Sequence, residues 1–389
     1  MGIHQKIMWF FAILGLASMQ FTFVNATPMQ ETAERRIVTY HSSHSFQERM
    51  RTMQDIRARF VKRLENVSNV EVVELTPTQE AILKLKYKDI VIEPDAIAYT
   101  TAETLPWGVN RIDAEKVSPV TSGQSVNVAV LDTGIDLHHP DLRFNIKGQY
   151  NAITPYAQAQ DGNGHGTHVA GIIAAVANRN GVVGVSPRAN IYAVKVLADN
   201  GSGYVSDIVE GIEWAKSRGI KVINMSLGTG VDVYALRDAV QRAKAAGITI
   251  VAASGNTGGS VSYPAAYSEV IAVGAVDASG NVASWSSRGP EVDIVAPGVN
   301  ILSTYRYFSY ANMSGTSMAA PHVAAVAALL VSYPVNCQNL LDGFAGCSPD
   351  EIQKRIEMTA EILAQDSIIE KDSVYGSGMV DAEKAVLNK

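Results

Sequence analysis

Three short motifs in this 389-residue chain carry the side chains that nucleophilic hydrolysis needs. Asp132 ends the apolar run VAVLD, His165 lies between two glycines in GHGTHVAG, and Ser317 lies in NMSGTSMAAPH, where an alanine-rich helix is expected to begin. A serine hydroxyl is a weak nucleophile, so it needs a base to take its proton and an acid to orient that base. The residue types therefore predict Ser317 as nucleophile, His165 as base and Asp132 as the orienting acid.

The order Asp, His, Ser along the chain distinguishes between hydrolase folds. In α/β-hydrolases the acid and the histidine follow the serine, and chymotrypsin-like enzymes use His, Asp, Ser, whereas the order found here is that of subtilisin. Only His322 lies beyond Ser317, on the same predicted helix and past Pro321, where it cannot turn back to the hydroxyl. With these motifs, nearly the whole chain after its leader resembles a subtilisin-like serine protease (subtilase family) with an N-terminal inhibitor-type propeptide.

Other interpretations of the motifs are weaker. The Asp-Thr-Gly at Asp132 also occurs in aspartic proteases, but that class needs a second copy, which the sequence lacks. His165 and His168 could suggest zinc, but the glutamate of the His-Glu-x-x-His motif is missing and Gly166 disfavours a ligand-bearing helix. Two alternatives remain open: an esterase that uses the same triad, and a non-catalytic binding protein on the same scaffold.

The apolar pattern of the C-terminal three quarters of the chain predicts an α/β fold. Strand-like runs without polar alternation are covered on both faces, and their alternation with helices implies a parallel sheet in a three-layer, subtilisin-like domain. The expected strands are 126–131, 191–197, 222–225, 248–253 and 270–276, and the expected helices are 168–177, 206–218 and 234–246. Sites in such folds gather at the carboxyl ends of the strands, which is where Asp132 lies.

The N-terminal part predicts a leader and a small α+β domain. Residues 1–26 have the basic start, apolar middle and small terminal residue of a signal peptide, with an uncleaved anchor as the alternative. Residues 27–101 are expected to form the propeptide, and 102–389 the catalytic domain. The expected elements of the propeptide are strand 37–40, helix 46–64, strand 70–75, helix 77–85 and strand 89–92. Tyr99 and Thr101 are the two candidate cleavage points, and an unrelated binding domain is the alternative to a propeptide.

Composition and charge limit the kinds of partner that the protein is expected to bind. The net charge is only −6 and no basic stripe is present, so nucleic acid is not expected as a partner. With a signal peptide, the protein is expected to be secreted and extracellular, without stable membrane association, and to act as a monomer. The partners expected from the resemblance are protein and peptide substrates, together with the chain's own propeptide as inhibitor and folding assistant.

The resemblance also nominates residues around the reacting groups. The Ser317 backbone N–H and the Asn256 side chain would stabilise the oxyanion that attack generates. Two segments are suited to flank an extended substrate as sheet edges, and a third forms a wall without carboxylates. That wall predicts apolar or aromatic residues before the cut and no preference for basic ones. The substrate-binding residues expected are Ser226, Leu227, Gly228, Gly201, Ser202, Gly203, Ala253 and Gly255.

The loop from Val176 to Val182 resembles the calcium loop of the family. Calcium prefers oxygen ligands, many of them backbone carbonyls in irregular loops. The resemblance implies a Ca²⁺ site with ligands from Glu103, Asp141, Val176, Asn178, Asn180 and Val182, and a plain surface loop is the alternative. Arg179 departs from the family by placing positive charge near this position.

The only two cysteines, Cys337 and Cys347, lie close together and outside the motifs. In an oxidising compartment they could close a small loop. The common subtilisin pattern has no such pair, so the hypothesis of a disulfide rests on their close spacing and on the expected export of the chain.

Overall fold

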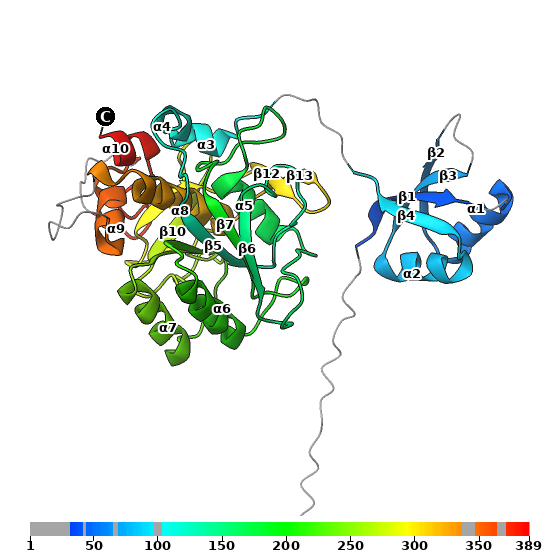
Figure 1. Ribbon diagram of the computed structural model, residues 1–389, viewed down its shortest axis with the longest axis horizontal. Coiled ribbons are helices and arrows are strands. Elements are labelled where there is room, and N and C mark those ends of the chain that lie inside the picture. Colours follow the sequence, from blue (N-terminus) through cyan, green and yellow to red (C-terminus); the bar gives the residue numbers. More distant parts are fainter. Residues whose placement is uncertain are drawn as a thin grey trace, which may run out of the picture. The chain divides into compact units, whose positions relative to one another are not determined.

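The chain forms two compact units, one ending at Asp95 and the other beginning at Ala96 (Figure 1). The structure is a computed structural model, and it describes residues 32–41, 44–64, 69–96, 103–336, 347–363 and 371–388. The predicted signal peptide and both candidate cleavage points lie outside these residues, so the boundaries at 26 and 101 stay predictions. Within the described residues, no helix is both long and apolar enough to span a bilayer.

The N-terminal unit is a four-stranded antiparallel sheet with two helices, in the order β2-β3-β1-β4. The strands are β1 (Glu34–Tyr40), β2 (Arg59–Arg63), β3 (Val70–Leu75) and β4 (Ile90–Pro94), and the helices are α1 (Phe46–Asp55) and α2 (Pro77–Lys86). The apolar side of the sheet packs on the helices through Val38, Val73, Met53 and Leu83, all buried. The α+β class predicted for this part is confirmed.

The helix predicted over 46–64 is wrong in its second half. Helix α1 ends at Asp55, and Arg57 takes a left-handed conformation at φ 54° that turns the chain. Residues Arg59–Arg63 then pair antiparallel with β3. Arg59 faces Glu74 across the ladder at 2.7 Å, an interaction that helical spacing could not reveal. The charged pattern of this segment therefore suited a strand at the edge of the sheet.

The C-terminal unit is built on a seven-stranded sheet in which every pairing is parallel. The strand order is β11-β10-β9-β8-β5-β7-β6. The strands are β5 (Asn127–Asp132), β6 (Ile146–Asn151), β7 (Asn190–Lys195), β8 (Val222–Met225), β9 (Thr249–Ala253), β10 (Ile271–Val276) and β11 (Ile294–Pro297). All five predicted strands are present, and the two edge strands β6 and β11 are additional.

Helices cover both faces of this sheet, so the domain has three layers as predicted (Figure 1). One face packs on α5 (His165–Ala174) and the long helix α8 (Thr316–Ser332), and the other packs on α6 (Val205–Ser217) and α7 (Tyr234–Ala245). Helix α8 continues through Pro321 and buries most of its alanine-rich length. The apolar character on all sides of α8 follows from this central position.

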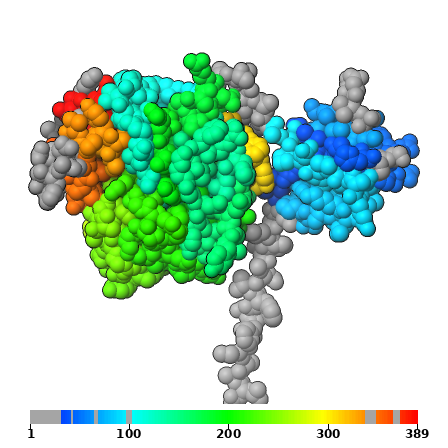
Figure 2. All heavy atoms as spheres, viewed as in Figure 1, coloured from blue at the N-terminus to red at the C-terminus, as the bar shows by residue number. Residues whose placement is uncertain are grey.

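Shorter elements complete the unit. They are the hairpin β12 (Ile301–Tyr305) and β13 (Ser309–Met313), helices α3 (Trp107–Arg111), α4 (Ala114–Val117), α9 (Pro349–Met358) and α10 (Ala382–Leu387), and the 3₁₀ turn Pro334–Asn336. In Figure 2 the red C-terminal segment lies beside the cyan segment that contains α3 and α4. Beneath this surface, the Ala382 N–H donates to the Ile112 carbonyl at 2.8 Å, and both residues are buried. Cys347 is disulfide-bonded, and the chain's other cysteine, Cys337, lies outside the described residues.

Candidate active site

Asp132 and His165 meet at the carboxyl edge of the sheet. Asp132 is the last residue of β5 and is buried, and His165 is the first residue of α5. The His165 Nδ1 lies 2.7 Å from the Asp132 Oδ1, which also accepts the Thr133 N–H at 2.7 Å. Because the carboxylate holds Nδ1, the other ring nitrogen, Nε2, is left to face a reacting group. The geometry is that of a base oriented by an acid.

The environment of His165 favours its charged form. Burial alone would lower its pKa, but the charge of Asp132 and the hydrogen bond to it outweigh burial, and Asp161 adds to them, so the pKa lies above the usual value. The side chain of His165 remains 21% exposed, so solvent and substrate can reach it. An imidazole that gains a proton readily and stays accessible suits a general base.

A second buried carboxylate, Asp161, joins the segments that carry Asp132 and His165. One of its oxygens accepts hydrogen bonds from Thr133 Oγ1 and from the N–H groups of Asn163 and Gly164, each at 2.9 Å. The other accepts the Thr167 N–H at 2.9 Å and the Thr167 Oγ1 at 2.6 Å. Asp161 thus caps the start of α5, whose N-cap residue Gly164 has no side chain to do so.

Sequence reasoning missed Asp161, although one signal was present. An aspartate shortly before a glycine and a helix is typical of a capping residue. Its link to Thr133, which lies 28 positions earlier in the chain, becomes visible only in the fold.

Ser317 is the second residue of α8 and exchanges two hydrogen bonds with Ser226, just after β8. The Ser317 Oγ donates to the Ser226 carbonyl at 3.2 Å, and the Ser226 Oγ donates to the Ser317 carbonyl at 2.8 Å. Ser226 Oγ in turn accepts from the Asn224 side chain at 3.0 Å. Since Ser226 and His165 line the same cleft, Ser317 contacts the wall of the cleft that contains the base.

Two nitrogen donors converge beside Gly315. The Asn256 Oδ1 accepts hydrogen bonds from the Thr316 N–H and the Thr316 Oγ1, both at 2.9 Å. These bonds fix the plane of the side-chain amide and direct its Nδ2 away from Thr316. The point where a Cβ on Gly315 would lie is 3.5 Å from Asn256 Nδ2 and 3.6 Å from the Ser317 nitrogen. The missing side chain of Gly315 therefore leaves a space flanked by both donors.

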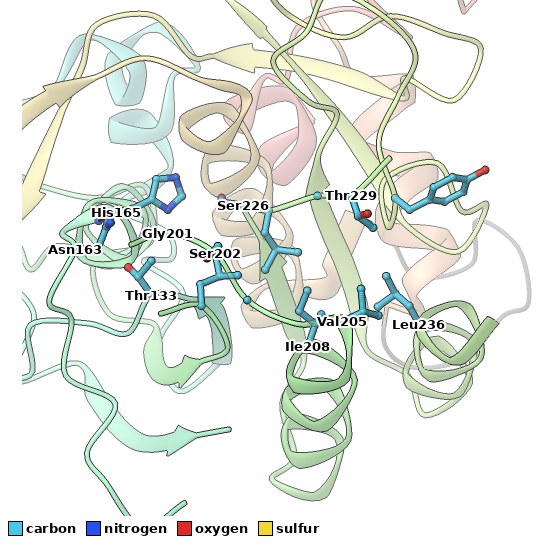
Figure 3. Close-up of a pocket in the computed structure, with 15 residues that line it drawn as sticks. Thr133, Asn163, His165, Gly201, Ser202, Val205, Ile208, Ser226, Thr229 and Leu236 are labelled. Carbon is cyan, nitrogen blue, oxygen red and sulfur yellow. Dashed lines mark hydrogen bonds between the residues drawn. The ribbon is translucent and has the colours of Figure 1, made fainter. Parts of the chain in front are cut away.

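A cleft of about 450 Å³ runs from His165 toward apolar side chains (Figure 3). It contains all six residues predicted for the two flanking segments, namely Gly201, Ser202, Gly203, Ser226, Leu227 and Gly228. Tyr263 also lines the cleft, and the lining residues that sequence reasoning missed are Thr133, Asn163, Leu197, Val205, Ile208, Thr229 and Leu236. None of the lining residues is an aspartate, glutamate, lysine or arginine.

Ala253 and Gly255, also predicted to bind substrate, do not line this cleft. Ala253 ends β9 and is buried. Gly255 has a left-handed φ of 117°, and a Cβ there would lie 2.8 Å from the hydroxyls of Ser262 and Ser287. Its N–H donates to Thr316 Oγ1 at 3.2 Å, so the residue lies beside the segment that holds Asn256 and Ser317 in place.

The six residues predicted as calcium ligands lie together. Asp141 accepts the Val182 N–H at 3.0 Å and the Asn178 Nδ2 at 2.9 Å, and its carbonyl accepts the Val176 N–H at 2.9 Å. The Glu103 carboxylate accepts the Asn178 N–H at 2.7 Å, and the Asn180 N–H donates to Asn178 Oδ1 at 2.8 Å. The loop thus brings oxygen-rich groups from three segments to one place.

The oxygens of this loop fit a hard cation. Among the described residues, neither Glu103 nor Asp141 pairs with a lysine or arginine side chain, and no N–H donates to the carbonyls of Val176, Asn180 or Val182. Arg179, the departure from the family pattern, donates its backbone N–H to Glu103 at 2.9 Å. Two carboxylates without a cationic partner beside free carbonyls are a set of donors that suits calcium.

Comparison with known proteins agrees with this architecture. The family model described as "Subtilase family" matches residues 123–381. The chain is 46% identical to M-protease of Shouchella clausii (strain KSM-K16) over 315 residues, which cover 80% of this chain and 78% of the relative. It is 47% identical to Subtilisin Savinase of Lederbergia lenta over 286 residues, which cover 73% of this chain and 99% of the relative. Subtilisin J of Geobacillus stearothermophilus is 38% identical over 400 aligned positions, which cover 98% of this chain and 100% of the relative.

The parallel three-layer domain, the acid–histidine pair and these similarities define a serine endopeptidase. The chain belongs to the subtilase family.

Proposed function

We propose that the chain is a secreted endopeptidase of broad specificity that uses Asp132, His165 and Ser317 as its catalytic triad. The 2.7 Å contact between His165 Nδ1 and Asp132 Oδ1 at the end of the cleft is the main support for this assignment. The Ser317 hydroxyl, bonded to the Ser226 carbonyl in this structure, would turn to His165 Nε2 before attack. Asp132 would hold the imidazole and stabilise its protonated form.

The chemistry follows from these positions. Ser317 Oγ attacks the scissile carbonyl while His165 takes its proton, and His165 later returns that proton to the leaving amine. The negative charge that develops on the carbonyl oxygen needs donors already in place. The space beside Gly315, 3.5 Å from Asn256 Nδ2 and 3.6 Å from the Ser317 nitrogen, supports the role of these two groups as the oxyanion hole.

The cleft supports a preference for apolar or aromatic residues before the cut. Val205, Ile208 and Leu236 form an apolar end, and the backbone segments that flank the cleft are poor in side chains. An extended peptide would pair with those segments as an added strand, so recognition would depend mainly on backbone and tolerate many sequences. A panel of chromogenic peptides should be cleaved fastest after apolar residues, and fastest cleavage after Arg or Lys would contradict this preference.

The N-terminal unit is proposed to be a propeptide that assists folding and then inhibits the enzyme, which acts as a monomer outside the cell. Its independent α+β core and its place before the subtilase domain support this role. N-terminal sequencing of the product made by wild type and by Ser317→Ala tests the proposal. A cut between Tyr99 and Glu103 should appear only with wild type, and the same cut in the variant would contradict autoprocessing.

We further propose calcium as a structural cofactor in the loop around Asp141. Glu103, Asp141 and Asn178 would supply side-chain oxygens, and Val176, Asn180 and Val182 would supply carbonyls. Within the described part of the chain, these carbonyls accept no N–H and the two carboxylates have no cationic partner, which supports this site. The ion would tie the segment near Glu103 to the loop that follows α5.

A further inference from the structure

The turn of the hairpin β12–β13 places two aromatic residues in an unfavourable backbone conformation. Tyr305 pairs with Ser309, so Arg306, Tyr307 and Phe308 form the turn. Tyr307 and Phe308 both have a φ of 59°, in the left-handed region that glycine and asparagine adopt far more readily than aromatic residues do. Aromatic residues are therefore unfavourable at these two positions if the turn serves only to reverse the direction of the chain.

Burial does not compensate for this conformation. Tyr307 is 41% exposed and Phe308 is 53% exposed, so both residues are accessible from solvent. The Arg306 guanidinium lies over the Tyr307 ring, with its Cζ 5.1 Å from the ring centroid. A pair of aromatic residues held at a protein surface in strained backbone is typical of a binding surface.

The turn is fixed to the segment that precedes His165. The Tyr305 hydroxyl donates to the Asn163 carbonyl at 3.1 Å, and Arg306 Nη1 donates to the Gly162 carbonyl at 2.6 Å. The Phe308 N–H donates to Asp136 Oδ2 at 3.2 Å. These contacts hold the backbone of the turn in place before any partner arrives, which lowers the entropic cost of binding.

The same contacts place the turn next to the cleft. Asn163 lines the cleft at its His165 end, whereas Leu236 lies at the apolar end (Figure 3). The hairpin packs against this His165 end, because a Cβ on Gly164 would lie 2.3 Å from the Tyr305 ring. A polypeptide that fills the cleft and continues past Asn163 would therefore run toward the two aromatic residues.

We propose that Tyr307 and Phe308 form a docking surface for the part of a protein substrate that extends beyond the Asn163 end of the cleft. The partner is a flexible polypeptide, whose apolar side chains and backbone can lie on the rings. The surface would increase the affinity for long substrates and leave short peptides, which end within the cleft, unaffected. This inference rests on the proposed endopeptidase function.

The test is a double variant, Tyr307→Asn with Phe308→Gly, made in the full chain. Asparagine and glycine adopt positive φ readily, so the turn should keep its shape and the thermal midpoint should stay the same or rise. We expect kcat/KM for unfolded, carboxymethylated casein to fall about threefold to tenfold, mainly through KM, the size of effect that aromatic contacts give. We expect kcat/KM for a short chromogenic peptide to stay at the wild-type value.

Tyr156→Asn is the matched control, because Tyr156 is an exposed aromatic residue that also has a positive φ, of 69°, and it does not line the cleft. It should leave both rates unchanged. The single variant Phe308→Asn should give a smaller loss on casein alone. Equal rates on casein for the double variant and wild type, or equal losses on both substrates, would overturn the docking surface. Failure of wild type to cleave the short peptide would instead overturn the proposed function.

Discussion

The Ser226 hydroxyl donates to the carbonyl of Ser317 at 2.8 Å, and this bond completes the first turn of α8. In a regular helix the N–H four residues later would bond to that carbonyl, but residue 321 is a proline and has no N–H. Ser226 thus replaces the donor that Pro321 lacks. The bond ties the turn that bears the nucleophile to the edge of the substrate cleft.

Replacing Ser226 with alanine should therefore affect both stability and rate. The Ser317 carbonyl would lose its donor, and because leaving a fully buried acceptor unpaired costs about 1–3 kcal/mol, the cost for this partly buried carbonyl should be near the lower end of that range. We expect the free energy of unfolding, measured in urea on the Ser317→Ala background, to fall by that amount, and kcat of the active enzyme to fall with it. Ser202→Ala is the control in the same cleft, because the Ser202 hydroxyl bonds only to nearby Asn200 among the residues that the structure describes. Equal stability of the two variants would contradict the role given to Ser226.

Asp161 is expected to position His165 and to raise its pKa. Asp161→Asn removes a negative charge and puts an NH₂ group among five donors, so the start of α5 should shift. We expect kcat/KM to fall about tenfold or more, the size of effect that misplacing a catalytic group produces. Because Asp161 helps to raise the pKa of His165, the acidic limb of the pH–rate profile should move to lower pH.

Asp277→Asn is the control for this profile, since Asp277 accepts several hydrogen bonds in an exposed turn away from the cleft. If the Asp161 variant is slower but the acidic limb of its pH–rate profile does not shift, Asp161 has only a structural role and does not raise the pKa of His165.

Two fully buried histidines predict how stability depends on pH. Burial lowers the pKa of His168 to about 4 and that of His322 to about 4, in each case outweighing their hydrogen bonds to backbone carbonyls. The unfolded chain therefore binds more protons than the folded chain between pH 6.5 and 4. Each histidine contributes stability that is fully present above pH 6.5 and is lost as pH falls through about 4, with a slope of up to about 1.4 kcal/mol per pH unit.

Urea unfolding of Ser317→Ala between pH 7 and pH 4.5, at constant calcium, measures this slope without self-digestion. The variant His322→Gln should reduce the slope of the free energy of unfolding against pH by the contribution of one histidine. A free energy of unfolding that stays constant over this range would contradict the neutral, buried state of both residues.

Removal of calcium should destabilise the mature enzyme. Ligand binding to the folded state at 100 to 1000 times its Kd adds about 3–4 kcal/mol, so excess EDTA should lower the thermal midpoint of an inhibited sample by about 5–15 °C. Asp141→Ala should have a low midpoint that EDTA no longer changes, whereas Asp277→Asn should respond as wild type does. An EDTA-insensitive midpoint in wild type would remove the calcium proposal.

The sequence predicts the centre of the fold better than its edges. Strands such as β8 and β9 are buried on both faces, so their apolar runs are continuous and easy to recognise. The edge strand β6 reads IKGQYN and is partly exposed, and β11 has only four residues ending in Pro297, so neither carries that signal.

The candidate site shows the same contrast. The motifs around Asp132, His165 and Ser317 are local and can be read directly. The apolar end of the cleft uses Val205, Ile208 and Leu236, which look in the sequence like core positions of amphipathic helices. Only the packing of α6 and α7 beside the sheet shows that these side chains also face a cleft.

Covalent labelling of the nucleophile is the most direct test of the catalytic triad. Wild-type enzyme is incubated with phenylmethylsulfonyl fluoride, and the modified residue is located by peptide mass mapping. An activated serine reacts far faster than an ordinary hydroxyl. We expect one sulfonyl group per chain, on Ser317, with complete loss of activity and with no labelling of His165→Ala. Stoichiometric labelling at another residue, or undiminished activity after Ser317 is modified, would contradict it.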